Sequence, residues 1–400
     1  MVTDGGLARV VLTDRRFGVR EDFLQRRLPA AVAEGVIASR RHLNPGLRPS
    51  AVAPLRTVVS ALTRRELLGG LAPGRSLPFD PLPALERVTS RAMARHTFGP
   101  GADAVAGSAS DLLEALSAMI GNPFALPANR VTPARRRILR HYEHTMGLVR
   151  ALLRSRMEDP DAFPDHAAQV ARGFDAARLE ECAHMLVGAL LAADRVPGAA
   201  AAWMLLCLSD HAPQAERLEP EAALFAQHLE DGQAPPLSSY PRAVAFVREV
   251  LRLHPPTWLI TRTATGPVGL GGYEFSAGHT FMLSPYALQR DERVLDDASR
   301  FRPERWATSA PPGFFLPFGQ GLHRCPGQHF ALSLLVSILL TVVHEVRVSR
   351  APGTVTADPR TTLLPVGLAV TLQPRSARSG RGVAAAAGGG GGEPLPRCLA

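Results

Sequence analysis

One stretch near the C-terminal end constrains this chain of 400 residues more than any other. Residues 315–331 read FLPFGQGLHRCPGQHFA, with Cys325 between two upstream glycines and a long apolar run. Pro326 suits a first helical turn, where its missing N–H costs nothing. A helix starting near Gln328 directs free N–H groups and its positive dipole end at the sulfur. The stretch therefore predicts a thiolate with a lowered pKa, well placed to bind a metal.

Several residues around Cys325 suit a flat, acidic ligand. Gly319 and Gly321 let the backbone approach such a ligand without an intervening side chain. His323 and Arg324 place donors where carboxylates on that ligand would be held. The alternative is a buried structural cysteine at a loop-to-helix junction, which is the commoner setting for a single cysteine. The whole pattern, however, is far rarer than a lone cysteine.

The pattern Phe-Gly-x-Gly-x-His-Arg-Cys-Pro-Gly-x-x-Phe-Ala, from Phe318 to Ala331, resembles the haem-binding signature of the cytochrome P-450 family, in its soluble bacterial type. The resemblance implies that Cys325 is the axial thiolate of a haem b iron, whose electron donation favours O–O cleavage. It also implies that residues of the same stretch contact the haem, namely Phe318, Gly319, His323 and Gly327.

Two further motifs carry the same resemblance. Glu249 and Arg252 are three residues apart, so they share a helix face, and alone they would usually form a weak surface ion pair. They resemble the Glu-x-x-Arg helix of the family, and Phe301-x-Pro-Glu-Arg-Trp resembles its meander motif. The resemblance implies a buried network of Glu249, Arg252 and Arg305 that fixes the cysteine loop rather than performing chemistry.

The resemblance also assigns residues to the haem propionates. Arg262 matches an arginine that follows the Glu-x-x-Arg helix, Arg40 one of an early basic helix, and His323 lies two residues before the cysteine. The arginine fork meets a carboxylate in a bidentate manner and stays charged. The alternative for each is an ordinary surface or loop residue.

Residues 179–209 form a nearly continuous apolar stretch, interrupted at Asp194-Arg195-Val196-Pro197. A long helix of this kind must be buried, and Pro197 predicts a kink, although two shorter helices are the alternative. In the family the kink carries an acid followed by Thr, which deliver protons. Here those positions hold Arg195 and Val196, so neither side chain is a general acid at neutral pH, and Asp194 lies one position early. Asp194, Arg195 and Val196 are the predicted distal catalytic positions.

Composition excludes several classes of protein. The net charge of +9 comes from arginine alone, since the chain has no lysine, and the arginines are scattered without an aromatic ladder, which favours an acidic protein partner over nucleic acid. The four cysteines are far apart and show no C-x-x-C spacing, which argues against a disulfide framework or a zinc module. No signal peptide is evident, and the apolar run 330–343 is too short to span a bilayer, so we expect a cytoplasmic protein without membrane attachment.

The expected fold is mainly α with a smaller β-rich portion, and the resemblance implies a haem between the long kinked helix and the cysteine loop. Residues 1–373 would form this haem-thiolate domain. The family normally has a helix and strands ahead of the segment that resembles residues 10–17, so either the chain is truncated or its main sheet lacks edge strands and is less stable. Residues 374–400, rich in Arg, Ala and Gly, would be a disordered tail that includes Cys398.

The expected activity is haem-thiolate monooxygenation, an oxidoreductase reaction of secondary metabolism, in which one oxygen atom of O2 enters a small organic substrate. A ferredoxin or flavodoxin with its reductase would supply the electrons, because no flavin or iron–sulfur module is fused to the chain. Two alternatives stay open. One is a peroxide-driven or non-oxidative haem-thiolate enzyme, such as an isomerase, dehydratase or cyclase. The other is a non-catalytic haem-binding protein.

Overall fold

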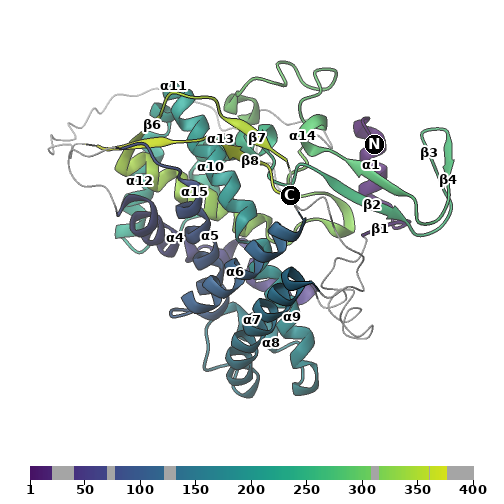
Figure 1. Cartoon of the computed structure of the whole chain (residues 1–400). Helices are drawn as coiled ribbons and strands as arrows, with labels where there is room; N and C mark the ends of the chain where they lie inside the picture. Colours follow the sequence, from purple (N-terminus) through teal and green to yellow (C-terminus); the bar gives the residue numbers. More distant parts are fainter. Residues whose placement is uncertain (20–39, 70–76, 121–131, 308–314, 360, 376–400) are drawn as a thin grey trace, which may run out of the picture.

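The computed structural model describes residues 1–19, 40–69, 77–120, 132–307, 315–359 and 361–375, and the side chains of Arg40 and Ile120 lie outside the description. Helices dominate (Figure 1). The α-helices have these bounds: α1 Gly5–Thr13, α3 Pro49–Val52, α4 Leu55–Thr63, α5 Leu82–Phe98, α6 Asp103–Ile120, α7 Pro133–Glu158, α8 His166–Ala171, α9 Leu179–Ala192, α10 Arg195–Asp210, α11 Ala212–Arg217, α12 Glu219–Glu230, α13 Pro241–Leu253, α14 Pro285–Leu288 and α15 Gln328–Glu345.

Shorter helical turns and nine strands complete the described elements. The turns are η2 Arg40–Leu43, η3 Pro45–Leu47, η4 Arg64–Leu68, η5 Ala176–Arg178, η6 Leu237–Ser239, η7 Pro303–Ala307 and η8 Gly321–His323. The strands are β1 Phe17–Gly18, β2 Ile260–Ala264, β3 Val268–Leu270, β4 Tyr273–Phe275, β5 Thr280–Leu283, β6 Val346–Arg350, β7 Thr356–Asp358, β8 Leu364–Val366 and β9 Val370–Pro374. The predicted mainly α fold with a smaller β-rich portion is confirmed.

The core is built around α10 and α15, two helices in which most residues are buried. Residues Leu334 to Val343 of α15 are all buried, because the helix packs against α4, α12 and α13 on different sides. Helix α10 packs chiefly against α5 and also contacts α13 and α15. A helix that is hydrophobic all round must be covered all round, and here its neighbours cover it.

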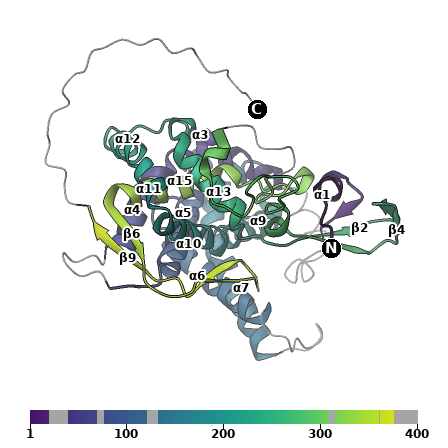
Figure 2. The same cartoon turned by 90° about the horizontal axis from the view of Figure 1, so that it is seen from above.

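The β-rich portion lies to one side of the helices. Figures 1 and 2 both place α1, β2 and β4 on one side of the molecule and α4 and α12 on the opposite side. Its sheet has the order β1-β2-β5, with both pairs antiparallel, and β3 pairs with β4 as a separate hairpin. A second cluster of buried apolar residues joins this sheet to α1, separate from the main helical core.

The free edge of this sheet is thinly covered. On the side of β5 away from β2, one isolated parallel bridge joins Val2 to Leu283, and the Val2 N–H donates to the Met282 carbonyl at 2.8 Å. Among the described residues no further strand pairs with β5. The predicted shortage of edge strands stays a prediction, because residues 20–39 lie outside the described residues.

The long apolar stretch is two helices rather than one. Helix α9 ends at Ala192 and α10 begins at Arg195, with Ala193 and Asp194 in non-helical conformations. Pro197 is the third residue of α10, inside the first turn, where N–H groups have no intrahelical partner in any case. The break therefore precedes the proline, and the alternative of two helices holds over a single kinked one.

Two segments are long and apolar enough to cross a membrane, Ala176–Asp210 and Gln328–Glu345. Within their most apolar windows, 67% and 72% of the residues are buried inside the protein. Burial of this extent is typical of core helices, and the first segment also contains the break at Asp194. The predicted disordered tail falls almost wholly on residues 376–400, outside the described residues, and stays a prediction.

Candidate active site

The cysteine loop has the predicted construction. The Cys325 N–H donates to the Phe318 carbonyl at 2.8 Å, so the loop between them closes on itself. Gly319 has a φ of +65°, a conformation that favours glycine, and its N–H donates to the Leu316 carbonyl at 3.0 Å. Helix α15 then begins at Gln328, with Gly327 as its N-cap residue. The loop thus presents the thiol at the N-terminal end of a deeply buried helix.

Gly321 has a different role from the predicted one. It has a φ of +71°, and a Cβ atom there would lie 2.3 Å from the Leu12 carbonyl oxygen and 2.9 Å from Thr13 Cα. The glycine therefore lets α1 approach the loop, rather than opening space for a flat ligand. The contact ties the cysteine loop to the β-rich portion of the molecule.

Cys325 is exposed, whereas Cys182 and Cys207 are buried. Burial raises the pKa of the Cys182 thiol to about 12 and raises that of Cys207 further, which makes both unreactive. Although Cys325 is exposed to solvent, the surrounding protein atoms still desolvate its thiol and raise its pKa, and the Gly327 N–H and the charge of Arg324 oppose that rise. The predicted lowering of this pKa was wrong for the chain by itself, because desolvation outweighs both favourable interactions.

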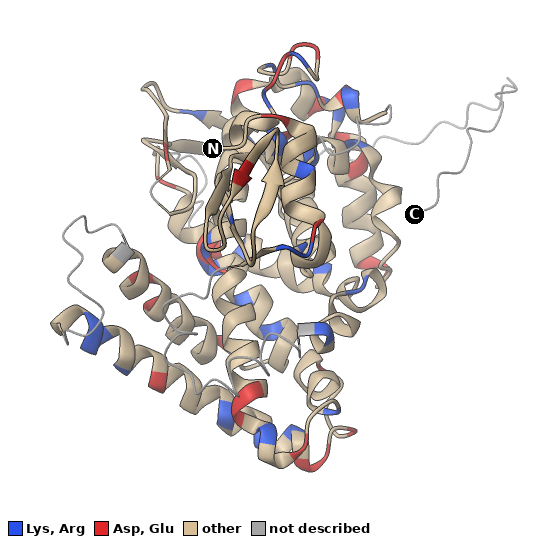
Figure 3. Cartoon of the chain, turned by 90° about the vertical axis from the view of Figure 1, so that its right-hand side faces the viewer, with Lys and Arg blue, Asp and Glu red and all other residues tan. Residues whose placement is uncertain are grey.

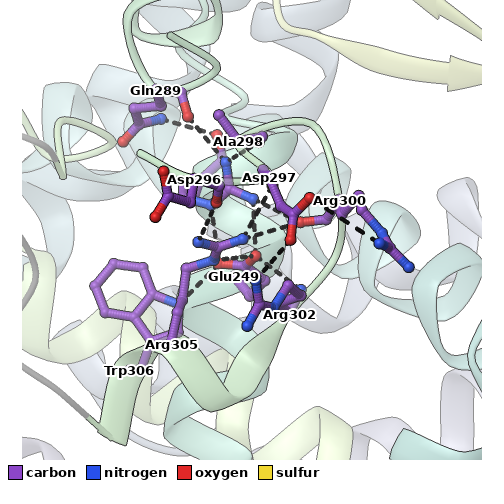
Figure 4. Close-up of polar contacts among 10 residues, drawn as sticks. Glu249, Gln289, Asp296, Asp297, Ala298, Arg300, Arg302, Arg305 and Trp306 are labelled. Atoms are coloured by element: carbon purple, nitrogen blue, oxygen red, sulfur yellow. Dashed lines mark hydrogen bonds and ion pairs between the residues drawn. The ribbon is translucent and has the colours of Figure 1, made fainter. Parts of the chain in front are cut away.

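Glu249 and Arg252 form a fully buried ion pair, and Figure 4 shows the polar contacts that surround Glu249. Arg252 donates from Nε and Nη2 to the Glu249 carboxylate at 2.9 and 2.7 Å, and from Nη1 to the Gln289 carbonyl at 2.8 Å. The pair lies on α13, which begins at Pro241 and ends at Leu253. Both charged side chains are wholly removed from water, so removing either one would leave the charge of the other buried without its partner.

Arg305 completes the predicted triad from the turn η7. Its Nε donates to Glu249 Oε1 at 3.0 Å, and the side chain is 10% exposed. Trp306 adds a bond that sequence reasoning missed, since its Nε1–H donates to Glu249 Oε2 at 2.9 Å. Its ring packs edge-on against Phe315, with centroids 5.0 Å apart, at the start of the cysteine loop. The only signal was the position of Trp306 inside the quoted meander motif.

Arg262 provides the test of whether the site fits a haem. It lies on β2, is 6% exposed, and donates from Nη1 to the Thr261 carbonyl at 2.8 Å. Its buried Nε has no hydrogen-bond partner, and among the described residues no carboxylate pairs with it. Burial lowers the pKa of this guanidinium. A buried cation with an unpaired donor calls for an acidic ligand group, which a haem propionate would supply.

The structure gives less information on the other residues that were predicted to contact haem. His323 ends the 3-10 turn η8, two residues before Cys325, and is half-buried. Phe318 is half-buried in the loop, with its ring 6.2 Å from that of Phe315. Arg40 begins η2, but its side chain lies outside the described residues. In the described part of the chain, no group of three or more His, Cys, Asp or Glu residues could hold a metal ion.

The helix break carries a buried polar cluster. The Asp194 carboxylate accepts a hydrogen bond from the Ser110 hydroxyl, and its backbone carbonyl accepts one from Thr89 Oγ1 at 2.8 Å. Arg195 Nε lies 3.2 Å from Glu86 Oε1 on α5, an ion pair that sequence reasoning missed. Burial raises the pKa of both Asp194 and Glu86. Hydrogen bonds from α5 and α6 thus hold the helix break in place, and the Glu86 carboxylate neutralises the charge of Arg195.

Comparison with known proteins gives one consistent answer. The sequence model of the family "Cytochrome P450" matches residues 198–376. Cyclooctat-9-en-7-ol 5-monooxygenase of Streptomyces melanosporofaciens is 28% identical over 79% of this chain and 71% of its own length. Pentalenene oxygenase of Streptomyces avermitilis is 30% identical over 58% of this chain, and the match spans only 47% of that relative.

Solved structures agree at the level of the fold. The crystal structure of a cytochrome P450, CYP102L1, superposes with a TM-score of 0.76 at 18% identity, covering 93% of this chain and 92% of that one. The haem domain of cytochrome P450DA gives the same TM-score at 17% identity. With the cysteine loop and the glutamate–arginine network in place, the sequence and the fold agree: the chain has the cytochrome P450 fold, and its residues 198–376 match the sequence model of the cytochrome P450 family.

Proposed function

We propose that the protein is a haem-thiolate monooxygenase acting on a small organic substrate, with Cys325 as the thiolate ligand of haem b. The observation that carries the proposal is that the chain has both an exposed thiol just before α15 and a buried arginine, Arg262, whose Nε has no hydrogen-bond partner. Bound haem would supply the oxidation, in which one atom of O2 enters the substrate and the other leaves as water.

The chain's own residues would hold and shield this cofactor. We assign Arg262, Arg40 and His323 to the propionates, and Phe318, Gly319 and Gly327 to contacts around the thiolate. The network of Glu249, Arg252 and Arg305 would keep the loop in one conformation, because a buried ion pair that is fully hydrogen-bonded tolerates little displacement. Residues 1–373 would act as one such domain.

For the distal side we propose Asp194, Arg195 and Val196. Asp194 is the candidate proton holder, since burial raises the pKa of its carboxyl and Ser110 keeps it in place. Arg195 is already neutralised by Glu86, so its role would be to fix the helix break rather than to anchor a carboxylated substrate. Val196, which is 37% exposed, would offer an apolar surface.

The substrate class and the redox partner follow from the relatives. Two of the similar proteins are named as a cyclooctatenol monooxygenase and a pentalenene oxygenase, which favours a hydrophobic terpenoid-like substrate of secondary metabolism. A separate ferredoxin or flavodoxin with a reductase would supply the electrons in the cytoplasm. On the side that Figure 3 presents, acidic and basic residues are interspersed along the helices, and we propose no nucleic-acid partner.

A second candidate is a haem-thiolate enzyme that uses peroxide or performs no oxidation, such as an isomerase, dehydratase or cyclase. The observation that favours it is the break itself, where Arg195 forms an ion pair and Val196 carries no hydroxyl. Turnover with hydrogen peroxide but none with O2, a reductase and a ferredoxin would favour this candidate. A purified protein that retains no haem would favour a non-catalytic role instead.

The absorption spectrum of the reduced, carbon-monoxide-bound protein tests the proposal. The wild-type protein should show the red-shifted Soret band of thiolate ligation, and Cys325→Ser should abolish it. Cys182→Ser and Cys207→Ser are the matched controls, because both thiols are buried with raised pKa values. Persistence of the band in Cys325→Ser, with its loss in either control, would refute the assignment.

A further inference from the structure

Gln289 occupies a wholly buried position between the ion pair of Glu249 and Arg252 and the cysteine loop. It follows the short helix α14 and contributes three polar groups to its surroundings. Its side-chain Nε2 donates to the Arg252 carbonyl at 3.0 Å, and its own backbone carbonyl accepts from Arg252 Nη1 at 2.8 Å. A buried amide of this kind is held in one orientation, because each of its partners is itself fixed.

The remaining group of Gln289 reaches the loop. Its Oε1 accepts the Leu316 N–H at 2.8 Å, and Leu316 is buried. The Leu316 carbonyl in turn accepts the Gly319 N–H, and the Phe318 carbonyl accepts the Cys325 N–H. A continuous set of hydrogen bonds therefore leads from Arg252 through Gln289 to the backbone turn that carries the thiol.

We propose that Gln289 is a positioning residue, which transmits the rigid geometry of the Glu249–Arg252 pair to the loop and so fixes the placement of Cys325. Trp306 gives a second connection between Glu249 and the loop, because its Nε1 donates to the Glu249 carboxylate and its ring packs on Phe315. The Oε1 of Gln289 is the group that constrains the loop's main chain directly.

The proposal rests on the haem-thiolate function and makes a distinct prediction about two variants. Gln289→Met keeps the volume and removes both side-chain hydrogen bonds. Gln289→Glu keeps an oxygen acceptor for the Leu316 N–H. In the reduced carbonyl complex, Gln289→Met should lose most of the red-shifted band in favour of a blue-shifted one, whereas Gln289→Glu should retain it. If wild type lacks the red-shifted band, the proposed function fails; if wild type and Gln289→Met both keep it, this inference fails.

Hydrogen exchange gives a readout that is independent of bound haem. In Gln289→Met the amides of the loop around Leu316 should exchange at least tenfold faster than in wild type, while those of α13 around Glu249 keep their protection. Gln214→Leu is the matched control, since Gln214 also bonds a motif residue, Glu304, but at the surface. Equal loss of protection in both segments would mean a general structural role and would overturn the inference. If Gln289→Met is insoluble, failure of Gln289→Glu to keep wild-type loop protection would overturn it equally.

Discussion

Removing the Glu249 carboxylate is the perturbation whose size the structure defines best. The carboxylate accepts from Arg252 Nε and Nη2, Arg305 Nε, the Arg302 N–H and Trp306 Nε1, all between 2.7 and 3.0 Å. In Glu249→Ala, Arg252 stays buried and keeps only carbonyl acceptors for its charge, among them those of Gln289 and Arg300. Breaking one partner out of a buried pair costs about 3–5 kcal/mol. We therefore expect a loss of about 4 kcal/mol, a large part of the usual ~5–15 kcal/mol of folding stability.

Denaturant unfolding, followed by circular dichroism and tryptophan fluorescence, measures this loss, and haem content after purification measures its consequence. The matched control is Glu304→Ala, from the same region of the chain, whose ion pair with Arg217 leaves both side chains at least half exposed and is worth about 0–1 kcal/mol. The Glu249→Ala protein should unfold at clearly lower denaturant and hold little haem. A change of under about 1 kcal/mol, similar to the control, would show that the pair is not buried as described.

Three further predictions concern the haem contacts and the helix break. Arg262→Gln should raise the rate of haem loss to apomyoglobin several-fold without lowering the stability of the haem-free protein, since its guanidinium is buried without an acidic partner; unchanged loss would remove Arg262 from the propionate site. Arg195→Ala should change the binding of acidic and neutral ligands, read from the Soret shift, to the same extent, because Glu86 already neutralises this charge. Weaker binding of acidic ligands alone would instead indicate that Arg195 anchors their acidic group. Asp194→Asn should be more stable than wild type near pH 7, and the difference should vanish below about pH 4. The reason is that burial raises the pKa of Asp194 in the folded state. Wild type therefore loses stability as the pH rises from the pKa of the unfolded state through that of the folded state. If the stabilities of the two proteins ran parallel with pH, this explanation would be wrong.

Elements with local signals were predicted well from the sequence. Helix α13 has the expected bounds because a proline occupies its first turn and His254-Pro255 ends it. The apolar periodicity of residues 109–120 predicts a helix, but it covers only part of α6, which begins six residues earlier at Asp103. The cause is Gly107, a weak helix former that reads as a break, although tertiary packing overrides its propensity.

The polar partners of the site were beyond sequence reasoning, because they join residues distant in the chain. Glu86 lies 109 positions from Arg195, and Gln289 lies 37 positions from Arg252. Neither residue belongs to a motif, and a single glutamate or glutamine has many possible partners in a chain of 400 residues. Only the packing of α10 against α5, and of α13 against α14, brings these groups together.

The two halves of the site differ in predictability for one physical reason. On the cysteine side, the turn, the thiol and the start of α15 are contiguous in sequence, so local chemistry determines most of the geometry. At the helix break, Pro197 predicts a disturbance but not its form. The form is set by α5, which approaches so closely that a Cβ on Gly198 would lie 2.9 Å from Glu86 Cγ. This close approach places Glu86 beside Arg195. Gly198 therefore accounts both for the packing of α5 at the break and for the neutralisation of the Arg195 charge.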